Sequence, residues 1–288
     1  MERKFIVRGI LAGIIAGLLA FVFARIFAEP QIQAAIDYES GRDAAQHVLD
    51  QAKGVPMESE HSDPFSRTVQ GNAGIGVGIV AFGAAMGGIF AVAFMLAAGR
   101  TGKLRPRTLA MLTALGGFLG FFMLPFLKYP ANPPAIGHEE TIKDRSGLFL
   151  LMVCVSIVLL VLAVWAGQRL RPRFGTWNAT LLAIAGGAVV LGVVMLLLPS
   201  LGELSANVKE YGKHATETPQ PLTDDQGKIV YPGFPADVLF KFRLYSVGAQ
   251  LILWAGIGLI FAPMAERLLG KAGSQPAGSP VEEAPASA

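Results

Sequence analysis

The stretch LPFLKYPANPPAIGHEETIKDRSGLF, residues 124–149, begins and ends in apolar sequence and has a polar, proline-rich centre. That centre contains one histidine, His138, followed by two glutamates and then Arg145. The uncharged runs on either side, 108–127 and 146–168, reach the length of about 20 residues that an α-helix needs to cross a bilayer. We therefore expect a loop between two membrane helices, which is either a plain connector or a place where the protein meets its solute.

The same pattern extends over the whole chain of 288 residues. The chain is 52% hydrophobic and 16% charged, with a mean hydropathy of +0.50, whereas soluble domains carry about 25% charged residues. Six runs contain no Asp, Glu, Lys or Arg: 9–24, 68–99, 108–127, 146–168, 174–202 and 244–265. They predict an all-α, polytopic membrane protein whose six transmembrane helices form three hairpins, at about 6–28, 72–98, 108–127, 147–168, 176–200 and 244–268.

The two ends of the chain need separate treatment. The basic start and apolar stretch of the first segment are also typical of a signal peptide, but the stretch is long and Arg25 precedes the weak cleavage-like site, so we expect a retained helix. The integral membrane domain is expected to cover 1–269. The remainder, 270–288, is rich in Gly, Pro, Ser and Ala and is expected to be a disordered cytoplasmic tail.

The loops differ in charge, which predicts an orientation. The short loops 99–107 and 169–173 contain only basic charges, and basic residues near helix ends mark the cytoplasmic side. The long loops 29–73, 128–146 and 201–243 hold 17 of the 21 acidic residues and all four histidines. We expect both termini in the cytoplasm of a bacterium and the acidic, histidine-bearing loops outside its inner membrane. The basic residues are not interleaved with aromatic ones, so we do not expect a nucleic-acid partner. The expected partner of the helices is membrane lipid.

Two of the long loops share a short motif. One contains Tyr129, Pro130 and Pro133, and the other contains Tyr231, Pro232 and Pro235, both in the pattern Y-P-x-x-P. An arginine follows each motif at the start of the next helix, Arg145 and Arg243. Proline stiffens such loops, which are either entrance arches lining a cavity or surface connectors. We expect the arginines to hold loop carboxylates, of which Asp144 and Asp237 are nearest in sequence; the alternative is contact with lipid headgroups.

The long loops also contain candidate metal ligands. Imidazole and carboxylate groups together suit divalent first-row ions such as Co²⁺. The candidates are Glu60, His61, Asp63, His138, Glu139 and Glu140. The alternative is that these are ordinary solvated acidic loops. Any metal is expected as transported cargo, with no permanently bound cofactor.

Other patterns limit the function. The chain contains no P-loop, no H-E-x-x-H, no G-x-S-x-G and no C-x-x-C, so an enzyme is not expected. No Asp, Glu, Lys or His lies deep in a predicted helix, which argues against a proton-coupled pump. Glycines at intervals of four, beginning with Gly9, Gly13 and Gly17, predict close helix packing. Within the first long loop, a helix is expected over about 30–53, with Gly41 as a candidate break.

Two stretches resemble a known family. KYPANPPAIGHEETIKDRSGLF (128–149) and YPGFPADVLFKFRLYSVGAQLILW (231–254) resemble the CbtA-type probable cobalt transporter subunits of bacteria, and EPQIQAAIDYE (29–39) fits as well. The resemblance covers about residues 1–270. It implies an inner-membrane protein of cobalt supply, often accompanied by a small partner, CbtB, with one membrane helix and a histidine-rich terminus. The family is usually described with about five helices, one fewer than expected here.

Two functions from different classes remain open. The first is a membrane subunit of a divalent metal uptake transporter, with cobalt as the ion and the outside loops gathering it. The second is a non-conducting scaffold that stabilises or docks another transport subunit, because helices that pack through glycines suit a scaffold as well as a pore. A scaffold should tolerate loss of the loop histidines and carboxylates.

Overall fold

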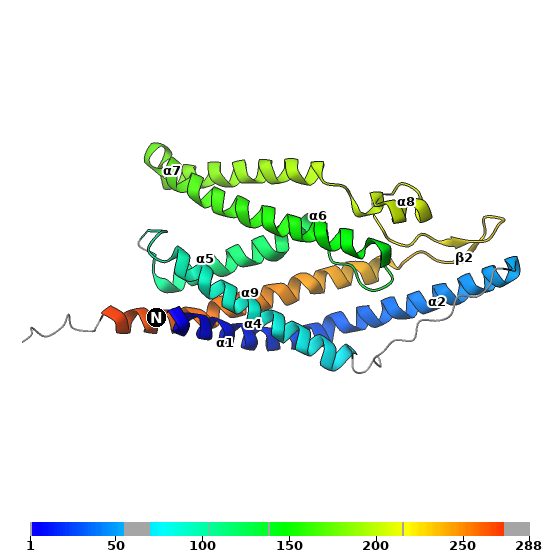
Figure 1. Ribbon diagram of the computed structural model, residues 1–288, viewed down its shortest axis with the longest axis horizontal. Coiled ribbons are helices and arrows are strands. Elements are labelled where there is room, and N and C mark those ends of the chain that lie inside the picture. The colour runs from blue at the N-terminus through cyan, green and yellow to red at the C-terminus, as the bar shows by residue number, and fades with distance from the viewer. Residues whose placement is uncertain (1, 55–69, 103, 138, 215, 274–288) are drawn as a thin grey trace, which may run out of the picture.

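The computed structural model describes residues 2–54, 70–102, 104–137, 139–214 and 216–273 (Figure 1). Five helical stretches are long and apolar enough to cross a membrane: Glu2–Lys53, Ile75–Ala97, Pro106–Lys128, Ile142–Glu203 and Ala236–Leu269. Helices dominate the described chain, with one small sheet. The prediction of an all-α, polytopic membrane protein is confirmed.

The fourth stretch accounts for the difference between five helices and the predicted six. It contains the helix α7 (Ile142–Leu197), in which Gly175 has the non-helical angles φ 74° and ψ 170°. The chain reverses there, as Figure 1 shows, and forms two arms. A Cβ atom added at Gly187 of the second arm would lie 3.8 Å from the Ala163 side chain of the first. The arms therefore run side by side, and the count of six crossings, with each arm counted separately, stays a prediction.

The first membrane helix does not end where we expected. The helix α1 (Glu2–Phe23) continues through a π-helical turn, η1 (Ala24–Ala28), into α2 (Glu29–Lys53). The expected helix over 30–53 is confirmed, and it is not broken at Gly41. Pro30 lies in the first turn of α2. Proline lacks an N–H, and its ring crowds the carbonyl four residues back, so the widened turn before it keeps the helix continuous.

The second and third predicted helices contain further π-helical turns. One, η2 (Gln70–Gly74), precedes α4 (Ile75–Ala97), which is followed by α5 (Pro106–Phe118). A further π-helical turn, η3 (Leu119–Met123), leads into α6 (Leu124–Lys128), which carries Pro125 in its first turn.

The second and third long loops contain small elements of their own. The second has η4 (Glu139–Thr141) before α7, and the third has η5 (Leu201–Glu203), α8 (Ser205–Tyr211), and the strands β1 (Leu222–Thr223) and β2 (Ile229–Tyr231). The strands are antiparallel, with Leu222 paired to Tyr231. The last helix, α9 (Ala236–Gly273), runs three residues past the start of the predicted tail, and the rest of that tail lies outside the described residues.

The main core lies between α1, α4, α5 and α9. Gly13 of α1 faces Gly83 of α4 so closely that a Cβ atom on either would meet the other's carbonyl oxygen. Gly9 and Gly87 face each other in the same way, which confirms the close packing predicted from the glycine spacing. Aromatic rings fill the neighbouring space, with the centroid of Phe261 5.0 Å from that of Phe90.

The two kinds of loop gather at opposite ends of the long axis (Figure 1). The N-terminus, the turn between α4 and α5, the Gly175 bend of α7 and the end of α9 lie at one end. The end of α2, α8 and β2 lie at the other, which we call the loop end. The charge segregation of the sequence is therefore a segregation in space.

Candidate functional site

Segments from all three long loops meet at the loop end. A buried apolar cluster joins Ala35 and Tyr38 of α2 to Ile136 of the second loop and Phe234 of the third. The Tyr38 hydroxyl donates to the Pro232 carbonyl oxygen at 3.0 Å. The loops are therefore packed on one another rather than independent.

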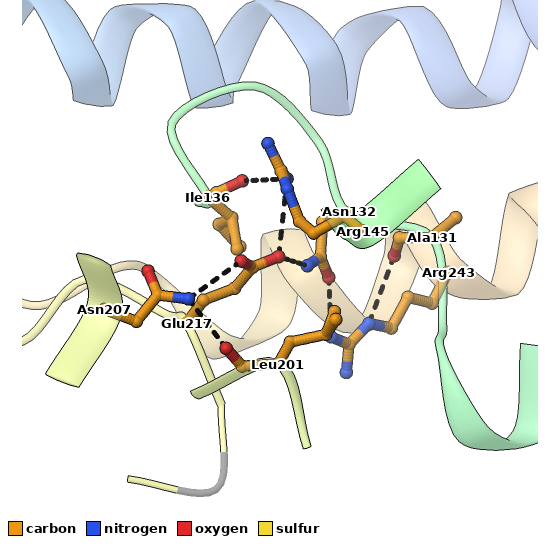
Figure 2. Close-up of polar contacts among 8 residues, drawn as sticks. All are labelled: Ala131, Asn132, Ile136, Arg145, Leu201, Asn207, Glu217 and Arg243. Atoms are coloured by element: carbon orange, nitrogen blue, oxygen red, sulfur yellow. Dashed lines mark hydrogen bonds and ion pairs between the residues drawn. The ribbon is translucent and has the colours of Figure 1, made fainter. Parts of the chain in front are cut away.

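A buried carboxylate lies at the centre of this end. The Glu217 residue is 2% exposed. Its Oε1 accepts from Asn132 Nδ2 at 3.0 Å and from Arg145 Nη1 at 3.4 Å, and its Oε2 accepts from Asn207 Nδ2 at 3.3 Å (Figure 2). A buried charge is stable only with such partners, because burial removes its hydration.

The Asn132 amide extends this group to α9. Its Oδ1 accepts from Arg243 Nη2 at 2.7 Å, while its Nδ2 donates to Glu217. Arg243 Nε also donates to the Ala131 carbonyl oxygen at 3.3 Å. One amide thus joins a guanidinium and a carboxylate that the structure does not place in direct hydrogen bond, as Figure 2 shows.

Backbone contacts complete the group, which we call the Glu217 cluster: Asn132, Arg145, Asn207, Glu217 and Arg243. Arg145 Nη1 donates to the Ile136 carbonyl oxygen at 3.2 Å, and Asn207 Nδ2 donates to the Leu201 carbonyl oxygen at 2.7 Å. The cluster therefore ties the second loop, the third loop, α7 and α9 together.

Glycine at position 137 makes the approach possible. Gly137 has a φ of 93°, which residues with side chains rarely adopt. A Cβ atom there would lie 2.5 Å from Arg145 Nη1 and 2.8 Å from Glu217 Oε2. The local sequence thus permits both the turn and the ion pair.

A pocket of about 510 Å³ lies beside the cluster. Its polar lining residues are Tyr129, Asn132, Arg145, Ser146 and Glu217, and apolar residues that include Phe122 form the rest. The Tyr129 hydroxyl donates to the Pro199 carbonyl oxygen at 2.9 Å, and burial raises the pKa of that phenol. The pocket therefore has a mainly apolar lining with a few neutral and charged polar groups.

The two Y-P-x-x-P motifs occupy different places. Tyr129 and Pro130 line the pocket, and Pro133 is buried nearby in the same loop. In the second motif, the Tyr231 ring packs 5.4 Å from the Tyr38 ring, measured between centroids. The other members of that motif, Pro232 and Pro235, are exposed. Within the described residues, only the first arch borders the pocket.

The arginines that follow the motifs have partners that are distant in sequence. Arg145 contacts a loop carboxylate as expected, but this is Glu217 rather than the adjacent Asp144. Arg243 bonds to oxygens of the second loop, whereas Asp237 pairs with Lys241 at 3.3 Å. Sequence proximity was wrong as a guide to the partners, because the fold brings loops from two hairpins together.

Most of the proposed metal ligands belong to parts of the chain that the structure does not describe. Glu60, His61, Asp63 and His138 lie outside the described residues, as does the Glu139 side chain, and Glu140 is exposed. Among the described residues, no three His, Cys, Asp or Glu side chains lie close enough together to hold a metal ion. The Glu217 cluster combines two guanidiniums with one carboxylate, so its net charge disfavours a bare cation and its contacts hold loops together.

Comparison with known proteins matches residues 2–266 to the family described as probable cobalt transporter subunit (CbtA). The chain belongs to the CbtA family. The match covers nearly the whole described structure, including the cluster and the pocket, and the resemblance seen in the sequence is confirmed. A subunit of a transporter works with partner proteins, and the family is one of transport rather than of a known enzyme class. No curated protein and no solved structure matches the chain.

The sequence did not point to the centre of the cluster. Asn132 lies inside a quoted motif, but Asn207 and Glu217 lie in a long polar loop where nothing in the local pattern distinguishes them. Arg145 and Glu217 are 72 positions apart, so the sequence carries no local signal of the ion pair.

Proposed function

We propose that this CbtA-family protein is a membrane subunit of a cobalt uptake transporter in a bacterial inner membrane. The observation that carries the proposal is the assembly of all three long, acidic loop segments at one end of the helices. The basic turns and the N-terminus at the other end support a cytoplasmic location for both termini. The family supports cobalt as the ion.

The outside loops gather the ion in this proposal. Glu60, His61, Asp63, His138, Glu139 and Glu140 supply weak, exchangeable ligands, which suits an ion that must be released again. Described residues on both sides of 138–140 are buried: Ile136 is 4% exposed and its carbonyl oxygen accepts from Arg145, and Thr141 is 1% exposed. The pocket behind Tyr129 and Pro130 is the entrance, and a small single-helix, histidine-rich partner of the CbtB type supplies further ligands.

Uptake of radioactive Co²⁺ at submicromolar concentration tests this proposal. Cells lacking the protein are compared with cells expressing it together with its partner. A variant with His61, His138, Glu139 and Glu140 changed to Ala is expected to insert normally and lose most uptake. The matched control is His47→Ala with His214→Ala, which removes two exposed histidines elsewhere on the loops. Equal loss in both variants would contradict the ligand assignment.

The second candidate is a non-conducting scaffold. The observation that favours it is the Glu217 cluster, whose one carboxylate is already paired with Arg145 and whose contacts join the loops to one another. A scaffold predicts that the four-residue variant keeps full uptake, provided the partner is present. It also predicts that deleting the protein removes the partner from the membrane, which immunoblotting of membrane fractions measures.

A further inference from the structure

We propose that the groove between α1 and α4 binds one anionic phospholipid, with an acyl chain in the groove and the headgroup beside Arg3 and Arg100. The groove has a volume of about 570 Å³. Its lining consists of apolar side chains and one glycine, and includes Ile6 and Ile10 of α1 and Gly88, Val92 and Leu96 of α4. The proposal is independent of the transported ion.

The length and the apolar lining of the groove suit a lipid acyl chain. The groove extends along α4 from Ala84 to Leu96, a length of about 18 Å at 1.5 Å per residue. An extended lipid acyl chain can lie along such a groove, and no polar atom of the lining demands a partner's hydrogen bond.

The groove ends at two exposed basic residues. Arg100 Nη1 donates to the carbonyl oxygen of Leu96, which itself lines the groove, at 2.7 Å. Arg3 precedes Ile6 and Ile10 by three and seven positions, so it continues the same face of α1. Both basic residues therefore stand at the helix ends where a headgroup phosphate would lie, and basic sites between membrane helices bind anionic headgroups.

The two parts of the site have different roles. Bulk lipid tails are as apolar as the groove, so the acyl chain gives little preference for one lipid over another. Selectivity must come from the basic side chains, each of which contributes about fivefold in affinity next to anionic lipid. The proposal therefore predicts that the protein prefers anionic lipids to uncharged ones. It also predicts that this preference is lost when a larger side chain fills the groove.

The test uses the full-length protein in nanodiscs that contain equal amounts of phosphatidylglycerol and phosphatidylcholine. Native mass spectrometry counts the lipids that remain on the protein after release. The wild type is expected to retain one phosphatidylglycerol in preference to phosphatidylcholine. Changing Arg3 and Arg100 to Gln should lower that preference about 25-fold. The matched control, Arg171→Gln with Arg173→Gln, removes the same charge from the α7 bend at the same end of the molecule and should leave the preference unchanged.

A second variant tests the groove itself. A Cβ atom on Gly88 would meet only the Ile10 side chain, at 3.5 Å, so Gly88→Leu fills the groove without a backbone clash. It should lower retention of the lipid, while Gly192→Leu, where a Cβ atom meets nothing within 4 Å, should not. Equal retention of both lipids by the wild type overturns the proposal. Unchanged retention in Gly88→Leu with loss of a co-purifying partner subunit also overturns it and assigns the groove to a helix.

Discussion

The seam between α1 and α4 and the attachment of α7 show two ways of fixing a membrane helix. At the seam, glycines bring the two backbones into contact. In the most apolar 18-residue segment of each of these helices, 33% is buried. In α7 the corresponding share is 17%. Helices in lipid gain no hydrophobic free energy from association, so close packing is what holds the first pair together. Because the α7 arms are packed less closely, other contacts must fix their position.

Polar contacts at the loop end do much to fix the position of α7. Arg145 near the start of α7 pairs with Glu217, and Pro199 just after its end accepts the Tyr129 hydrogen bond. Tyr129 also packs with Met152 of the first arm and Leu191 of the second. Elsewhere the arms present large apolar side chains to their surroundings, with Trp177 74% and Leu196 86% exposed. The core is therefore stabilised by close, complementary packing of its helices, and α7 by polar contacts at its loop end.

The largest effect is expected from filling the seam. Gly13→Leu places a side chain where even a Cβ atom would meet the Gly83 carbonyl oxygen, so α1 and α4 must separate. We expect destabilisation by more than about 3 kcal/mol and loss of most folded protein. Size-exclusion chromatography and thermal unfolding in detergent measure this. Gly116→Leu is the control, because a Cβ atom there meets nothing within 4 Å. Similar yields for the two variants would contradict the packing account.

A smaller and more local effect is expected at Glu217. Changing Glu217 to Ala removes the carboxylate that accepts from Asn132, Asn207 and Arg145, and it should destabilise the loop end by about 3 kcal/mol. Hydrogen exchange should increase in the second and third loops and at both ends of α7, while the α1–α4 seam keeps its protection.

The Glu217 prediction also has an internal control. Arg145→Ala and the double variant complete a double-mutant cycle, and the double variant should be less destabilised than the sum of the two single changes. Loss of protection at the seam as well would show that the two regions unfold as one unit.

Tyr129→Phe is expected to have a smaller effect still. It removes one hydrogen bond to Pro199 and should lower the free energy of unfolding by about 1 kcal/mol. Burial raises the pKa of this phenol above its ordinary value of 10.0, so the contribution is present below that pH and is lost as pH rises through the folded-state pKa. Unfolding measured from pH 7 upward should therefore show the wild type losing its advantage over the variant only in alkaline solution. A constant difference at all pH values would contradict this role of the hydroxyl.

The sequence predicted the regions held by local chemistry. Charge-free runs and glycine spacing follow directly from the requirements of a helix in lipid, so the helices and the α1–α4 seam were predictable. The helical continuation through Pro30 was predicted as a helix but not as an unbroken extension, because a π-helical turn has no clear sequence signal. The Glu217 cluster was not predictable, since its members are brought together by the packing of three loops and carry no common motif.

The smallest expected effect gives the most direct comparison of α7 with the α1–α4 seam, because the same Gly→Ala change is made in both. At Gly187 in α7, an added Cβ atom lies 3.8 Å from Ala163, an ordinary contact, so Gly187→Ala should be neutral or stabilise by up to about 1 kcal/mol through helix propensity. At Gly9 in α1 the same atom meets the Gly87 carbonyl oxygen, so Gly9→Ala should destabilise despite that propensity. Thermal unfolding of both variants measures the difference. Opposite signs support a core held by shape beside a loosely packed hairpin, whereas equal values would mean that α7 is packed as tightly as the seam.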